Sequence, residues 1–224
     1  MTPTLVRHDP VRDWVEIQER MLAPLYEAVH ERLGVGPGTR LLGLDCGSGL
    51  ALLMAAARGA RVAGTDPDAD RLAHARRRLA GHDAAPGPYD VVTAFHGGAA
   101  DVPGSAVRGA AVVLAGWGPR ERCASAAVLA EAGAEWPHDD LDLRAARAGL
   151  RPEGSGRVAC PFGYAGLDSA VRGLLSTGLL DAATAATDPA RVEKELTEAL
   201  HPYVRRDGTV WMPNVFRYVI ARVP

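Results

Sequence analysis

A glycine-rich segment behind a short apolar run most constrains how this chain folds. Residues 40–51 read Arg-Leu-Leu-Gly-Leu-Asp-Cys-Gly-Ser-Gly-Leu-Ala, which is typical of a buried strand, a tight turn and the start of a helix. The next apolar run, 60–66, ends in Asp66. In an open α/β sheet, glycines let the backbone approach a ligand, and a carboxylate at a strand tip binds ribose hydroxyls. The sequence therefore predicts a site for an adenosine-containing ligand.

Apolar runs and helical patterns alternate along the rest of the chain. This order predicts an α/β fold of the Rossmann-like kind, with a mostly parallel sheet and helices on both faces. Residues 205–223 are expected to add a C-terminal antiparallel hairpin, because Arg-Arg-Asp-Gly-Thr reads as a turn. Predicted strands are 40–44, 61–65, 89–95, 110–117 and 157–162, and predicted helices are 11–33 (bent or divided at Pro24), 50–58, 68–79, 119–133, 139–149, 167–175 and 189–200.

Composition excludes several classes of protein. The 224 residues are enough for one substantial core, and a net charge of −2 gives no electrostatic reason to expect nucleic-acid binding. The three cysteines form no CxxC pair, so neither a metal site nor a disulfide framework is expected. The acidic residues at 139–142 are expected to start a helix rather than to bind metal. No apolar run reaches the ~18 residues of a membrane span, and a cytoplasmic protein without membrane partners is expected.

These motifs resemble those of the class I S-adenosylmethionine-dependent methyltransferases, and the resemblance covers most of the chain. Residues 41–49 match the Cys-Gly-Ser-Gly part of the family's first motif, and Asp66 matches the ribose-binding acid after the second strand. The segment 89–95 resembles the family's fourth-strand motif, and 216–223 resembles its last antiparallel strand. The resemblance implies S-adenosyl-L-methionine as cofactor and a small-molecule acceptor as substrate.

The resemblance also implies roles for individual residues. His96 follows the fourth-strand motif and is the candidate general base, although a loop histidine can equally be solvated or cap a turn. Residues 1–36 are expected to form an N-terminal helical lid, and 118–188 a substrate-side insertion, within a single domain of residues 1–224. Candidate cofactor-binding residues are Gly43, Asp45, Cys46, Gly47, Ser48, Gly49, Asp66, Pro67 and Phe95, and candidate substrate-binding residues are Trp14, Tyr26 and Trp117.

Three features depart from the family pattern. Gly43 stands where the family has its acid, and Asp45 where it has its first glycine, so the two residue types have exchanged places. The segment between Leu79 and Tyr89 is too short for a full third strand, and 96–109 is too short for the usual helix after the fourth strand. These departures leave open a methyltransferase-like protein without methyl transfer, either a regulatory subunit or a repurposed catalyst such as a cyclase.

Dinucleotide binding is the competing interpretation of the glycine turn. A G-x-G-x-x-G pattern that starts at Gly47 places Leu52 where a small residue is needed for close packing of helix and strand. No second nucleotide-binding half follows. We therefore expect a methyltransferase acting on a small molecule, possessing no metal and existing as a monomer or homodimer, with specialised metabolism as one setting.

Overall fold

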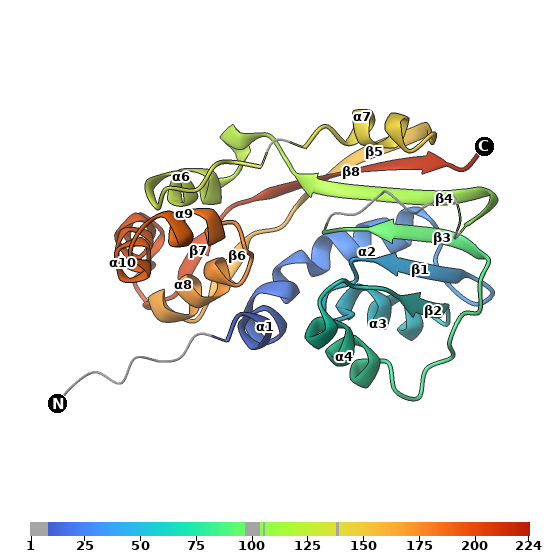
Figure 1. Cartoon of the computed structure of the whole chain (residues 1–224), viewed down its shortest axis with the longest axis horizontal. Coiled ribbons are helices and arrows are strands. Elements are labelled where there is room, and N and C mark those ends of the chain that lie inside the picture. Colours follow the sequence, from blue (N-terminus) through green and yellow to red (C-terminus); the bar gives the residue numbers. More distant parts are fainter. Residues whose placement is uncertain (1–8, 97–103, 105, 138) are drawn as a thin grey trace. The chain divides into compact units, whose positions relative to one another are not determined.

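The computed structural model describes residues 9–96, 104, 106–137 and 139–224 (Figure 1). Contacts within the chain divide it into two compact units. Unit 1 comprises Met1–Met21, Ala124–Trp136 and Pro161–Pro213, and unit 2 comprises Leu22–Cys123, Pro137–Cys160 and Asn214–Pro224. Among the helices that the structure describes, none is long and apolar enough to cross a bilayer.

Six strands of unit 2 form one sheet in the order β2-β1-β3-β4-β8-β5. The strands β2, β1, β3 and β4 run parallel, whereas β8 is antiparallel to both of its neighbours. This confirms the predicted Rossmann-like sheet and its antiparallel C-terminal strand. The bounds are β1 Arg40–Leu44, β2 Arg61–Gly64, β3 Tyr89–Ala94, β4 Ala106–Trp117, β5 Arg151–Ala159 and β8 Val215–Arg222.

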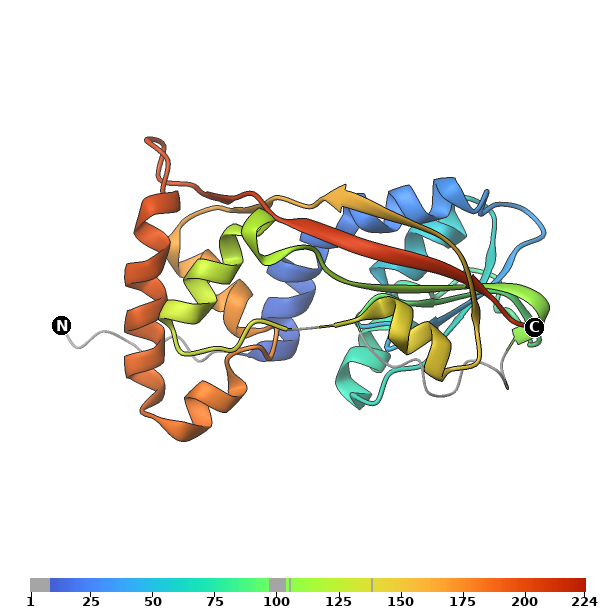
Figure 2. The same cartoon turned by 90° about the horizontal axis from the view of Figure 1, so that it is seen from above.

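Helices cover both faces of this sheet, as the sequence predicts (Figure 2). On one face lie α2 (Ala23–Arg32) and α3 (Leu50–Ala57), with α4 (Ala69–Arg78) beside α3; α7 (Leu141–Arg147) lies on the other. Side chains alternate along each strand. Val91 packs into the core beneath α3, and Val92 into the core beneath α7. Both faces of the sheet are therefore buried.

The segment between α4 and β3 is too short for a full strand, as its length suggests. Ala84 forms a single parallel bridge to Val62 of β2, and the described residues of this segment make no further strand pairing. The edge of the sheet beside β2 is thus covered by one bridged residue.

The turn predicted at 205–209 is present, but the strands that follow it pair with different partners. Arg205 N–H donates to the Thr209 carbonyl at 2.8 Å, and Val204 forms an antiparallel bridge to Val210. The strand β7 (Val210–Met212) then pairs with β6 (Phe162–Tyr164), whereas β8 pairs with β4 and β5.

The strand β5 begins six residues before the predicted strand at 157–162. Pro152, Gly154 and Gly156 obscure its pattern in the sequence, since proline and glycine argue against a central strand. The structure places β5 at the edge of the sheet, where both residue types are tolerated. The ring of Tyr218 on β8 lies over Gly156, where a Cβ would be 2.5 Å from the ring. Edge position and cross-strand aromatic packing therefore permit a strand here.

Unit 1 is mainly helical. Pro24 lies in the first turn of α2, so the predicted division of the 11–33 helix is present, and the turns before it are irregular. The elements of unit 1 are α1 Pro10–Asp13, a π-helix η1 Trp14–Gln18, a 3₁₀ turn η2 Glu19–Leu22, α6 Ala124–Glu131, β6, α8 Leu167–Leu175, α9 Asp181–Ala186, α10 Pro189–Leu200, η4 His201–Tyr203 and β7. The last residue of η2, Leu22, already belongs to unit 2. A further 3₁₀ turn, η3 Arg120–Arg122, lies in unit 2.

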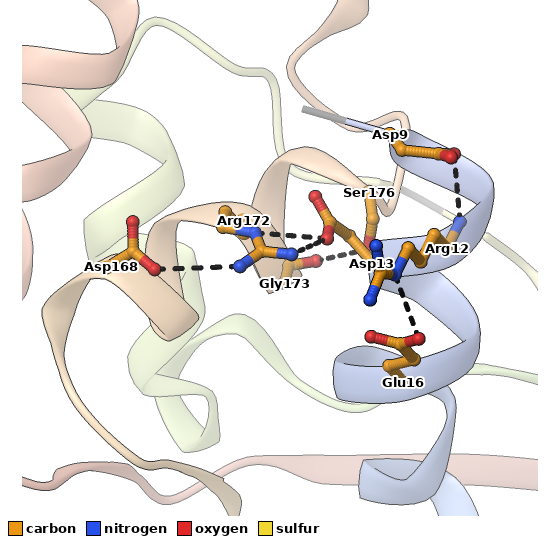
Figure 3. A network of polar contacts seen from close by, with 8 residues as sticks. All are labelled: Asp9, Arg12, Asp13, Glu16, Asp168, Arg172, Gly173 and Ser176. Atoms are coloured by element: carbon orange, nitrogen blue, oxygen red, sulfur yellow. Dashed lines mark hydrogen bonds and ion pairs between the residues drawn. The ribbon is translucent and has the colours of Figure 1, made fainter. Parts of the chain in front are cut away.

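A buried ion pair joins two helices of unit 1 (Figure 3). Asp13 of α1 is 1% exposed, and its Oδ1 accepts a hydrogen bond from Nε of Arg172 on α8 at 3.1 Å. Asp168 lies on the other side of the same guanidinium, at 3.7 Å. Because a buried charge without a partner costs several kcal/mol, this pair fixes how α1 and α8 meet.

The unit boundaries differ from the ranges suggested by the sequence. Within 118–188, residues 124–136 and 161–188 belong to unit 1, whereas α7 and β5 between them belong to the sheet unit. Within 1–36, α2 packs on the sheet. The apolar faces of α7 and α2 explain this, because each covers part of the sheet.

Candidate functional site

The turn after β1 contains three residues with positive φ. Asp45, Gly47 and Gly49 have φ values of 45°, 59° and 82°. Glycine adopts this region without steric cost, whereas the Cβ of an aspartate makes it unfavourable. At Gly49, a Cβ would also lie 2.9 Å from Cβ of Ala75 on α4. The turn is therefore held close to α4 and carries strain at Asp45.

Asp66, at the tip of β2, binds this turn directly. Its Oδ2 accepts a hydrogen bond from the Gly47 N–H at 2.8 Å, and its Oδ1 accepts one from the Asp68 N–H at 2.9 Å. A carboxylate offers roughly four lone-pair positions. The two that remain, on a half-buried side chain, are available to a ligand.

The helix α4 is capped by a neighbour of Asp66 in the sequence. Asp68 is the N-cap, and its Oδ1 accepts hydrogen bonds from the N–H groups of Asp70 and Arg71. Asp140 caps α7 in the same way, through the Leu143 N–H. The carboxylate of Asp66 instead joins the Gly47 N–H of the glycine turn to the Asp68 N–H before α4.

Arg78 of α4 holds the turn from its other side. Its Nη1 lies 3.0 Å from both the carbonyl oxygen and the Oγ of Ser48. Ser48 is completely buried. Its hydroxyl therefore serves the packing of the turn against α4. Charge-assisted hydrogen bonds of this kind are stronger than neutral ones, so Arg78 stiffens the turn.

Negative charge gathers at the tips of β1 and β2. Burial and the neighbouring carboxylate of Asp66 raise the pKa of Asp45, and the positive charge of Arg144 on α7 lowers it in part. Arg144 also pairs with Asp139. A group bearing positive charge would relieve the repulsion between Asp45 and Asp66.

Comparison with known proteins finds solved structures of similar fold, but no family model or curated protein of similar sequence. Among solved structures, a candidate methyltransferase from Bacillus halodurans superposes with a TM-score of 0.55 and 15% identity, over 89% of this chain and 98% of that one. The protein YJHP from E. coli gives a TM-score of 0.51 and 23% identity, over 96% and 94% of the two chains. The [4+2]-cyclase SpnF gives 0.51 and 16%, over 89% and 80%.

This chain has the class I S-adenosylmethionine-dependent methyltransferase fold. The fold expected from the sequence is therefore confirmed. Within it, the glycine turn follows β1 and Asp66 follows β2, at neighbouring strand tips.

The structure explains why position 43 is a glycine. Gly43 and Gly64 are paired in the sheet, and the side chain of Leu52 lies over both. A Cβ at Gly43 would be 3.1 Å from Leu52 Cδ2, and one at Gly64 would be 2.6 Å from Leu52 Cδ1. Cys46 fills the rest of this space, since its own Cβ would lie 3.2 Å from a Cβ at either glycine. The two glycines therefore make room for a leucine that would otherwise hold α3 away from the sheet.

The next site residues lie where β3 leaves the sheet. Leu44 pairs with Ala94 in the register of β1 and β3, so Phe95 and His96 emerge at the same edge as the glycine turn. The Tyr26 hydroxyl lies 3.0 Å from His96 Nε2. The Tyr26 and Phe95 rings are 4.9 Å apart, and both are buried. The structure thus brings together three residues that the sequence assigned to different roles.

The remaining predicted residues are more scattered. Trp117 is half-buried at the tip of β4, with its ring 4.5 Å from that of Phe216. Pro67 is exposed directly after Asp66. Trp14 is buried within unit 1, whereas the residues of the glycine turn belong to unit 2.

Two charged residues of the site were missed in the sequence. Arg78 is one of several arginines in α4, and no local pattern separates it from the others. Arg144 lies in α7, where the sequence likewise indicates no contact with the site. Only the folded arrangement distinguishes Arg78 from its exposed neighbour Arg77. Gly49 directly precedes α3 and Ala75 lies in α4. Their small size is the one feature of the sequence that indicates a close approach of the glycine turn to α4.

Proposed function

We propose that this chain is an S-adenosyl-L-methionine-dependent methyltransferase acting on a small-molecule acceptor. The observation that carries the proposal is the hydrogen bond from the Gly47 N–H to Asp66. It joins a glycine turn and a carboxylate at two neighbouring strand tips, and the carboxylate keeps lone pairs for ribose hydroxyls. The residues present therefore fit an adenosyl group.

Charges at the site fit the other end of the same cofactor. Asp45 is a strained, half-buried acid whose pKa is raised by burial and by Asp66. An ammonium group beside it would favour its ionised form and offset the repulsion. We assign Asp45 to the ammonium of the methionine part and Asp66 to the ribose.

Methyl transfer requires little of the protein beyond alignment and proton removal. S-adenosyl-L-methionine, held by Asp66 at its ribose and by Asp45 at its ammonium, would supply an activated methyl group on a cationic sulfur, with the neutral thioether as the leaving group. His96 emerges at the same edge and takes the proton that the acceptor nucleophile loses. Trp117, at the tip of β4, contributes an apolar wall for the acceptor. The expectation that 1–36 and 118–188 serve the acceptor stays a prediction.

Calorimetric titration of the purified protein with S-adenosyl-L-methionine tests the proposal. Binding in the micromolar range is expected, with Asp66→Asn as the paired variant that weakens it. Absence of heat at millimolar cofactor would reject the proposal. Incubation with a panel of phenols, catechols and primary amines, followed by mass spectrometry, identifies the acceptor class.

The exchange of Gly43 and Asp45 favours a second candidate function, a catalyst or regulatory subunit that binds the cofactor without transferring its methyl group. The likeness in fold to the [4+2]-cyclase SpnF shows that this architecture accommodates other chemistry. Cofactor that binds but yields no S-adenosylhomocysteine across the whole panel supports this candidate, and any turnover eliminates it.

A further inference from the structure

The contact between Tyr26 and His96 joins residues 70 positions apart in the sequence. Tyr26 lies on α2 and is completely buried, with its hydroxyl 3.0 Å from His96 Nε2. His96 itself is half-buried. The tyrosine therefore meets the histidine from inside the protein, while the histidine reaches the edge where the glycine turn lies.

The rings around this contact fix its geometry. The Tyr26 ring stands nearly perpendicular to the His96 ring, at 86° with centroids 6.1 Å apart. Phe95 packs against Tyr26 on one side and against His30 on the other, at centroid distances of 4.9 Å and 6.5 Å. A side chain packed in this way has few alternative rotamers, so its hydroxyl is a fixed partner for His96.

We infer that Tyr26 is a positioning residue that orients His96, so that Nδ1 is the nitrogen that takes the acceptor proton. This inference rests on the proposed function. A histidine that acts as a base must carry a lone pair on the nitrogen facing the acceptor. Because Nε2 lies 3.0 Å from the Tyr26 hydroxyl, the proposed role of Nδ1 requires the tautomer in which Nε2 carries the ring proton and donates it to the tyrosine oxygen.

The contact becomes more favourable during the reaction. The acceptor O–H or N–H bond breaks, its proton moves to His96 Nδ1, and its electron pair remains on the nucleophile to form the bond to carbon. The imidazolium then donates from both nitrogens, and its Nε2–H bond to Tyr26 is charge-assisted and stronger than before. Tyr26 therefore stabilises the protonated base without touching the acceptor.

The ring proton gives a test that does not depend on turnover. In long-range ¹H–¹⁵N spectra of the free protein above pH 7.5, His96 is expected to show its proton on Nε2, protected from exchange with water. Tyr26→Phe keeps the packing against Phe95 and should lose that protection. Tyr89→Phe, which removes a hydroxyl elsewhere in unit 2, is the matched control and should leave the signal unchanged. A ring proton on Nδ1, or protection that survives in Tyr26→Phe, overturns the inference.

Kinetics on the best acceptor of the phenol, catechol and amine panel supply a second readout. Tyr26→Phe should lower kcat about tenfold with the cofactor KM unchanged, because only the protonated base is affected. His96→Gln should lower it by ~100-fold or more, and adding Tyr26→Phe to it should then have no further effect. Full kcat in Tyr26→Phe contradicts the inference. If the protein binds no cofactor, the proposed function fails, and the spectra still decide the role of Tyr26.

Discussion

The Gly47 N–H donates a hydrogen bond to the Asp66 carboxylate at 2.8 Å, linking the turn after β1 to the tip of β2. The same carboxylate oxygens are thus shared between the fold and any ligand at this edge. Loss of the Asp66 carboxylate should therefore both loosen the turn and weaken ligand binding.

Replacing Asp66 by asparagine should weaken S-adenosyl-L-methionine binding at least tenfold, since an amide presents one acceptor oxygen where the carboxylate presents two. Calorimetry measures the affinity, and Asp83→Asn, at an exposed acid in the neighbouring segment, is the control. Equal affinities for the two variants would show that Asp66 serves the turn alone.

Arg78→Met should destabilise the protein by about 1–2 kcal/mol, because Ser48 loses charge-assisted hydrogen bonds at both its carbonyl and its hydroxyl. Arg77→Met on the same helix is exposed and should change the free energy of unfolding by less than about 0.5 kcal/mol. Urea denaturation measures both. We also expect cofactor binding to weaken in Arg78→Met and to stay unchanged in Arg77→Met. An equal loss of affinity in the two variants would argue against a role for the glycine turn in cofactor binding.

Two substitutions at Asp45 separate strain from charge. With φ at 45°, Asp45→Gly should be more stable than Asp45→Ala by about 1 kcal/mol, since both remove the charge but only glycine removes the Cβ strain. If the two variants unfold at the same urea concentration, the left-handed backbone is not a source of strain.

Charge at Asp45 should also make stability depend on pH. Because the pKa of Asp45 is raised above its ordinary value of 3.8, the ionised acid destabilises the folded state at neutral pH, and this penalty disappears as the pH falls through the raised pKa towards 3.8. Asp45→Asn should therefore be more stable than the natural protein at pH 7, by a margin that shrinks on acidification. A margin that grows on acidification contradicts the assignment.

His30 has the opposite dependence on pH. It is fully buried on α2, and within the described residues neither of its ring nitrogens has a hydrogen-bond partner. Burial, and then the charge of Arg58, lower its pKa from 6.5 to about 4. Below pH 6.5, His30 is protonated in the unfolded chain but stays neutral in the folded protein. The free energy of unfolding therefore falls between pH 6.5 and 4, by up to about 3 kcal/mol.

His30→Leu should abolish most of this acid destabilisation and raise the melting temperature at pH 5, because it also removes two unpaired polar atoms. Melting curves from pH 7 to 4 measure the effect. His82→Leu, at an exposed position, should keep the natural pH dependence. An unchanged acid slope in His30→Leu would place the responsible group elsewhere.

Placing an acid at position 43 should destabilise the protein while Leu52 remains. Gly43→Asp places a Cβ 3.1 Å from Leu52 Cδ2 and is expected to destabilise the protein by about 1–3 kcal/mol. The cost should be smaller when measured in a Leu52→Ala background, which a double-mutant cycle quantifies. Additive effects would mean that the two positions do not compete for space.

Local patterns in the sequence were sufficient for the central part of the fold. The run from Arg40 to Asp66 combines an apolar strand, positive-φ glycines and a strand-end acid, each recognisable within a few residues. The strand β5 was placed too late because Pro152 and two glycines are acceptable only at a sheet edge, and edge position is a property of the whole sheet.

Contacts between side chains far apart in the sequence could not be predicted from it. The pairing of Tyr26 with His96, and the space that Gly43 and Gly64 leave for Leu52, depend on side chains brought together by tertiary packing. Leu52 had counted only as an obstacle to dinucleotide binding. The side chain of Leu52 fits only because a second glycine, Gly64, lies beside Gly43 on a different strand. The spacing of residues along the chain does not predict this pairing.

The interleaved chain path has a consequence for engineering. Because unit 1 is assembled from stretches that are interrupted by β1 to β4 and again by α7 and β5, no contiguous piece of gene encodes it. A chimaera that exchanges this unit with a relative needs simultaneous splices after residues 21, 123, 136, 160 and 213. Swapping any one stretch alone would separate Asp13 from Arg172, or the helix α6 from α10, and leave buried groups without their partners.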